Sequence, residues 1–139
     1  MKRNGERGVS LIIVALVLTT LIILSAFVVD FGVMWLARGQ AQNAADAGAL
    51  AGATALVYDN SADFSNTGPA YVSASQVAAS NTVFGGTHGV EVFVDPAATW
   101  DPPKPPVCAT YGGCVQVNVY QDGTHSSALL PTYFAQVFG

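Results

Sequence analysis

The residues of this chain with the clearest capacity for chemistry are its two cysteines, Cys108 and Cys114, which enclose the segment Ala-Thr-Tyr-Gly-Gly. A redox centre normally has two residues between its cysteines, so this spacing argues against one. A zinc site would need two more ligands at suitable spacing, and both histidines are far away in sequence. We expect a disulfide, which would contribute about 2 kcal/mol if this part of the chain lies in an oxidising compartment.

The other residue types that serve catalysis are thinly spread. His88 and His125 each lie in a turn-like context rich in Gly, Ser and Thr, where a lone histidine is usually solvated. The aspartates are scattered singly, and the sequence contains no close carboxylate pair, phosphate-binding loop, nucleophile elbow or metal-binding helix motif. We therefore expect a protein that is not an enzyme and that uses no cofactor and no metal.

Composition points to a membrane. Of the 139 residues, 51% are hydrophobic and only 10% are charged, whereas a typical soluble domain is about 25% charged. Five basic residues against nine acidic ones argue against nucleic-acid binding. After residue 29 only Arg38 and Lys104 are basic, so the remainder of the chain is acidic, which favours solubility over binding to anionic lipid.

Val9 to Val29 is a run of 21 residues without charge or proline. As a helix it would span about 31 Å, which matches a hydrocarbon core of about 30 Å. A cleaved secretory signal would have a shorter apolar region, and a buried core helix seldom runs so long without charge. Its hydroxyl side chains are expected to bond to carbonyls one turn earlier; they are Ser10, Thr19, Thr20 and Ser25.

The flanking charges predict the orientation of this span. Lys2, Arg3 and Arg7 precede it, and the first charge after it is Asp30. The positive-inside rule then places residues 1–8 in the cytoplasm, residues 9–29 in the bilayer and the rest on the far side. Asp30 is expected to be a hydrated residue at the membrane boundary, with a pairing role in an assembly as the alternative.

Residues 30–58 predict a continuation of the same helix, because they contain no proline and are rich in alanine. Small residues recur along it at helical spacing, and they would let another backbone approach closely. That partner is either part of the same chain or a helix of a neighbouring molecule. The proposed packing residues are Gly39, Ala45, Gly48, Ala49 and Gly52.

Residues 59–139 predict a small α+β domain. A helix is expected from Pro69 to about Val83, and strands from Val90 to Val94 and from Cys114 to Tyr120, forming a short antiparallel sheet. The proline-rich residues 100–107 predict an extended excursion. The apolar tail, residues 130–138, is expected to open a short helix at Pro131 and to dock on the sheet; continued membrane association is the alternative.

Several segments resemble the TadE/TadG-like family of pilus-assembly proteins, which is associated with tight-adherence (Flp-type) pili. The resemblance covers about residues 7–54: a basic-Gly start at Arg7-Gly8, the apolar helix, the exit Val29-Asp30-Phe31-Gly32, and an Ala-rich helix in which Asn43-Ala44-Ala45-Asp46 is the most specific part. The ending, residues 131–139, also resembles a segment that follows a strand in TadG-like proteins.

The resemblance implies a pilin-like fold and a structural or assembly role in a bacterial cell envelope. The chain would be a single-pass protein of the inner membrane, with residues 59–139 periplasmic or extracellular. Its partners would be the lipid bilayer and other pilus or pilus-assembly subunits, with a homo-oligomer left open and no nucleic acid.

Members of the family that are processed like pilins carry a glycine followed five residues later by glutamate. Here Gly8 is present but position 13 is Ile. This departure favours an anchored assembly or accessory protein over a minor pilin cleaved between Gly8 and Val9. A membrane-tethered domain that binds a ligand or polysaccharide, with Trp100 and Tyr111 as an aromatic platform, is the third hypothesis.

Overall fold

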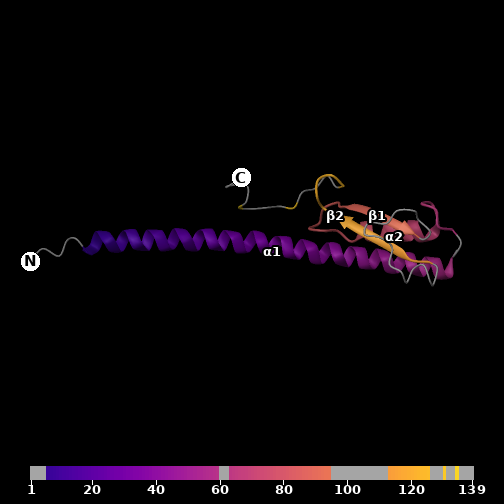
Figure 1. Ribbon diagram of the computed structural model, residues 1–139, viewed down its shortest axis with the longest axis horizontal. Helices are drawn as coiled ribbons and strands as arrows, with labels where there is room; N and C mark the ends of the chain where they lie inside the picture. The colour runs from indigo at the N-terminus through magenta and orange to yellow at the C-terminus, as the bar shows by residue number, and fades with distance from the viewer. Residues whose placement is uncertain (1–5, 60–62, 95–112, 126–129, 131–133, 135–139) are drawn as a thin grey trace, which may run out of the picture. The chain divides into compact units, whose positions relative to one another are not determined.

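The computed structural model describes residues 6–59, 63–94, 113–125, 130 and 134 (Figure 1). Its elements are α1 (Glu6–Tyr58), α2 (Pro69–Ser80), β1 (Gly89–Val94) and β2 (Val115–Tyr120). The chain divides into two compact units, Met1–Trp35 with Pro131–Gly139 and Leu36–Leu130. The predicted α+β class, with a long N-terminal helix and a short antiparallel sheet, is confirmed.

In the first unit, the apolar part of α1 is covered by little else in the chain. From Val9 to Val29 its large aliphatic and aromatic side chains are about half exposed or more, whereas the core helix of a soluble protein would be mostly buried. Three hydroxyls bond to carbonyls one turn earlier as predicted, Thr19 to Ala15, Thr20 to Leu16 and Ser25 to Leu21, each at 2.8 Å. By length and composition α1 can therefore cross a membrane.

The second helix begins where the sequence predicts. Pro69 occupies its first turn, where the missing N–H costs nothing, and the extended Gly68 precedes it with its carbonyl accepting from Val72 N at 3.0 Å. α2 ends at Ser80 rather than near Val83, because Asn81 adopts an extended conformation. Its buried residues Ala70, Ala74 and Ala78 recur at helical spacing.

The sheet consists of β1 and β2 in antiparallel register, with Val92 opposite Val117. Val117 is buried in the hydrophobic core, and Val115 and Val119 pack against it, as the alternating pattern predicts. The polar residues between them form a chain of side-chain hydrogen bonds, in which Gln116 Nε2 donates to Asn118 Oδ1 and Asn118 Nδ2 to the hydroxyl of Tyr120.

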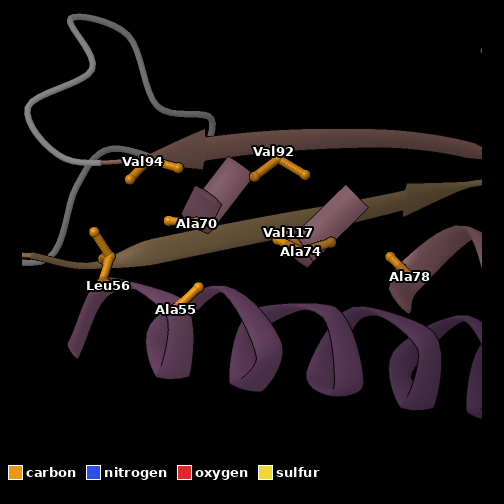
Figure 2. Packing of buried hydrophobic residues seen from close by; sticks show 8 residues of the cluster. All are labelled: Ala55, Leu56, Ala70, Ala74, Ala78, Val92, Val94 and Val117. Atoms are coloured by element: carbon orange, nitrogen blue, oxygen red, sulfur yellow. The ribbon is translucent and has the colours of Figure 1, made fainter. Parts of the chain in front are cut away.

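The core of the second unit is built from small side chains contributed by α1, α2 and both strands. Figure 2 shows them meeting in one cluster, and its members are Ala55, Leu56, Ala70, Ala74, Ala78, Val92, Val94 and Val117. All three α2 alanines are completely buried. Short side chains on the inner face of α2 allow its backbone to come close to α1. This close approach leaves no room for a side chain at two glycines of α1, which are described below.

A turn after α2 contacts α1 through one hydrogen bond. Val83 is fully buried and pairs with Gly86, and Phe84 between them has a positive φ of 51°. The N–H of Phe84 donates to Oε1 of Gln40 on α1, at 2.8 Å. The amide of Gln40 therefore compensates a backbone group that the tight turn leaves without a partner of its own.

Candidate functional site

The turn after β2 gathers the charged groups that most resemble a reactive cluster. Oδ1 of Asp122 accepts hydrogen bonds from the backbone N–H groups of His125 (2.9 Å) and Thr124 (3.0 Å), and His125 Nδ1 lies 2.8 Å from Asp122 Oδ2. The backbone hydrogen bond from His125, followed by its side chain, holds the pKa of Asp122 far below its ordinary value. The His125 ring stacks on Tyr120, with 4.4 Å between centroids.

This arrangement closes the turn and packs it on the sheet. The backbone of His125 lies so close to Gly89 at the start of β1 that a side chain at position 89 would clash with it. Glu91 Oε1 is 4.0 Å from His125 Nε2. The hydrogen bonds of Asp122 stabilise the turn. Among the residues that the structure describes, no three His, Cys, Asp or Glu side chains are placed to hold a metal ion.

The other histidine also has a structural place. His88 is partly buried, so the expectation that it is solvated is wrong. Its Nε2 lies 3.0 Å from the carbonyl oxygen of Ala78, and because a carbonyl only accepts, Nε2 carries the proton. The same carbonyl accepts the backbone N–H of Asn81 at 3.2 Å, so His88 adds a second hydrogen bond at the end of α2.

Two of the predicted packing glycines face α2 of the same chain. A Cβ atom added to Gly48 would lie 2.8 Å from Ala78 Cβ and 2.9 Å from the Ala74 carbonyl oxygen. One added to Gly52 would lie 2.9 Å from both Ala74 Cβ and Val115 Cγ1. The structure thus shows intramolecular packing for these two glycines, which is one of the alternatives that the sequence leaves open.

The other proposed packing residues differ in their surroundings. Ala45 and Ala49 are partly buried and pack against the same core. Gly39 is exposed, and a Cβ atom at this position would meet nothing within 4 Å. Of the motif residues, Asn43 is exposed, and Asp46 accepts a hydrogen bond from Gln42 Nε2 at 2.8 Å on the outer face of α1.

On its outer side the contact between α1 and α2 leaves an open groove of about 610 Å³. The lining is apolar or small, with Asp59 as its single charged residue, and it comprises Ala47, Leu50, Ala51, Thr54, Ala55, Tyr58, Asp59, Ser73 and Val77. Leu50 is 71% exposed and Tyr58 81%. Sequence reasoning missed this surface because it followed the small residues of α1, whereas the groove depends on where α2 packs.

Asp30 is the buried charged residue of α1, and only 8% of it is exposed. Its Oδ2 and Oδ1 lie 3.1 and 3.3 Å from the backbone nitrogen of Phe134, which donates to the carboxylate. The expectation of a hydrated boundary residue is therefore wrong. The expected docking of the tail on the sheet is also wrong at Phe134, the described residue of the tail after Leu130, because it contacts α1 instead.

Other predicted sites remain predictions. Gly8 and Val9 are exposed in the first turns of α1, and nothing in the geometry tests cleavage between them. Cys114 is half-buried just before β2, but Cys108 lies outside the described residues. The described residues also do not include the proline-rich excursion at 100–107, the start of the helix expected at Pro131, Trp100 or Tyr111.

Comparison with known proteins identifies one family. Residues 8–55 match the family described as putative Flp pilus-assembly TadE/G-like, which confirms the resemblance over that part of the chain. No curated protein and no solved structure matches the chain. The match takes in the whole apolar run, Asp30, the glycines that pack on α2 and most of the α1 side of the groove.

Proposed function

Because residues 8–55 carry a TadE/G-like sequence, we propose that the chain is a membrane-anchored assembly or accessory protein of a Tad/Flp-type pilus. The observation that carries this proposal is that the matched segment coincides with one helix that serves two purposes. Its first part is exposed and apolar enough to cross a bilayer, and its last part packs with α2. Such a helix supports anchoring and binding.

The proposed organisation follows the sequence. Residues 1–8 are cytoplasmic, residues 9–29 cross the inner membrane, residues 30–58 extend the helix, and residues 59–139 form a periplasmic or extracellular domain. The basic residues Lys2, Arg3 and Arg7 support this orientation. An oxidising compartment for the domain agrees with the predicted Cys108–Cys114 disulfide.

The proposed contact with another pilus subunit is the groove between α1 and α2. α2 of the same chain already packs against Gly48 and Gly52, so these glycines are not available to contact another subunit. The groove instead offers exposed Leu50 and Tyr58 with small residues between them. An apolar helix of a second subunit fits this chemistry, because a groove with a single carboxylate at one side requires little desolvation of charge.

Placing a charge in the groove tests this contact. Leu50→Glu should abolish co-purification of the full-length protein with pilus components from its native membrane, because the partner would have to bury a carboxylate. Leu50 is already largely exposed, so the domain itself should lose no more than about 0.5 kcal/mol.

Ala53→Glu is the matched control, since Ala53 is exposed on the same helix and does not line the groove. It should leave co-purification unchanged. Equal binding by the Leu50 variant and the wild type would remove the groove from the proposal, and loss of binding by both variants would show a charge effect unrelated to the groove.

A processed minor pilin is the alternative, because Gly8 stands at the start of α1 directly before the apolar run. The intact mass of the protein from its native membrane separates the two. A full-length mass supports the anchored factor, and loss of residues 1–8 supports the minor pilin despite Ile13.

A further inference from the structure

Asp30 holds a distant part of the chain at the end of the apolar run. It follows Val29 directly, it is buried, and its carboxylate accepts the N–H of Phe134, 104 residues later in the sequence. A carboxylate that far out of water is costly unless it is hydrogen-bonded. The contact therefore fixes the backbone at position 134 beside the residue that ends the uncharged run.

Three aromatic side chains follow the same part of α1. Phe27 and Phe31 stack with 6.3 Å between centroids, and Phe31 and Trp35 with 6.5 Å. All three are 53–71% exposed, so more than half of the surface of each residue faces outward. Phe134 is also partly exposed, at 40%.

The position of this aromatic ladder, defined as Phe27, Phe31 and Trp35, agrees with the boundary between the hydrocarbon and the headgroups. The ladder covers about 12 Å of helix, from about 4–5 Å before Asp30 to about 7–8 Å after it. If the uncharged run fills the hydrocarbon, the ladder begins inside it and ends within a headgroup layer of about 5–8 Å. Trp and Tyr concentrate at this depth in membrane proteins, and Trp35 at the outer end of the ladder is a residue of this kind.

The hydrogen bond to Phe134 also suits that environment. At the edge of the hydrocarbon, where water is scarce, a backbone N–H without a partner is costly, so chain that reaches this depth needs an acceptor from the protein. Asp30 supplies it for Phe134.

From these observations we infer that Phe134 is held by Asp30 at the headgroup–acyl boundary of the bilayer, beside the ladder. The partner is the lipid interface itself. The chain would then contact the membrane twice, once through the span and once through a part of the chain that does not cross it. This inference rests on the membrane anchoring proposed above, and it adds a function for Asp30 and for Phe134.

Depth-dependent fluorescence quenching tests it in the full-length protein. The protein is reconstituted in phosphatidylcholine vesicles whose acyl chains are brominated either near the headgroup or near the chain end. In a background with Trp35→Phe and Trp100→Phe, the substitution Phe134→Trp provides the reporter. Its fluorescence should be strongly quenched by the shallow bromine and little by the deep one.

Two further reporters separate the possible failures. Leu16→Trp places an indole in the span and should be quenched most by the deep bromine; if it is not quenched, the anchoring itself is wrong. Tyr58→Trp, at an exposed site in the second unit, should not be quenched. Quenching at position 16 without quenching at position 134 overturns the inference alone.

The role of Asp30 is tested in the same background. Asp30→Asn retains an oxygen that accepts the N–H of residue 134 and should preserve shallow quenching. Asp30→Leu removes the acceptor without removing helix propensity, and it should shift the reporter at position 134 into water with loss of quenching. Unchanged quenching in the Leu variant would show that Asp30 does not hold Phe134 there.

Discussion

Adding one methyl group at Gly48 should test the close packing of α1 on α2, because the other effects of the substitution can be matched by a control. The Cβ of Gly48→Ala would lie 2.8 Å from Ala78 Cβ and 2.9 Å from the Ala74 carbonyl oxygen. Both distances are shorter than real Cβ contacts, and the second atom belongs to the backbone, which cannot rotate away. The two helices must therefore move apart, and overpacking of this kind typically costs about 1–3 kcal/mol.

Gly39→Ala is the matched control, because Gly39 lies in the same helix and has open space around it. Both substitutions gain the same intrinsic helix propensity, about 1 kcal/mol relative to glycine. That gain, together with the change in the unfolded chain, cancels when the variants are compared. The Gly48 variant should therefore be less stable than the Gly39 variant by the steric cost alone, about 1–3 kcal/mol.

Hydrogen exchange of the α2 amides measures this difference in the full-length protein in mild detergent. These amides exchange when α2 opens from α1 and the sheet, so the steric cost should appear as exchange about 5- to 150-fold faster in the Gly48 variant than in the Gly39 variant. Equal protection in the two variants would refute the close contact of α2 with Gly48.

Two further outcomes follow from individual contacts and a third from the predicted disulfide. Gln40→Leu removes the acceptor of the partly buried Phe84 N–H and should lower the free energy of unfolding by about 1 kcal/mol in urea titrations, whereas Gln40→Glu retains an acceptor and should lose less. The pKa of Asp122 is lowered in the folded chain, chiefly by the backbone N–H of His125. The ionised Asp122 carboxylate therefore stabilises the folded chain fully above its pKa in the unfolded chain, about 4. This stabilisation is lost as the pH falls from about 4 towards the lower pKa of the folded chain. Amides of the 120–125 turn should lose protection over that pH range in the wild type and show no such decline in Asp122→Ala. The protein from its native membrane should gain two hydrogens on reduction if Cys108 and Cys114 are paired, and an unchanged mass would contradict both the disulfide and the oxidising compartment.

The sequence predicts the secondary structure well because each element carries a strong local signal. An uncharged run followed by alanine-rich sequence gives α1, Pro69 marks the start of α2, and alternating valines mark both strands. The predicted end of α2 is three residues too late. The helix stops before Asn81, although neither Asn81 nor Thr82 is a proline or glycine that would signal its end. His88, which bonds the Ala78 carbonyl, is a contact that no local pattern reveals.

The site is less predictable because it depends on pairings across the chain. The role of Gly48 depends on the placement of Ala74 and Ala78, and the hydrogen bond of the Asp30 carboxylate depends on Phe134. An aspartate at the end of an apolar run has the same sequence signature whether it is hydrated or bonded to a distant amide. Only the tertiary structure distinguishes these states.

Along its last turns α1 presents two faces with different chemistry, and this difference bears on how such a protein can assemble. The inner face is made of Gly48, Gly52 and alanines, and it is filled by α2. The outer face carries Leu50 and Tyr58, which are exposed beside the groove. A partner that required the inner face would have to displace α2 and open the core, at a cost comparable to unfolding the domain. A partner that uses the outer face needs no such rearrangement, so substitutions at Gly48 should impair folding first, while substitutions at Leu50 should impair assembly and leave the domain folded.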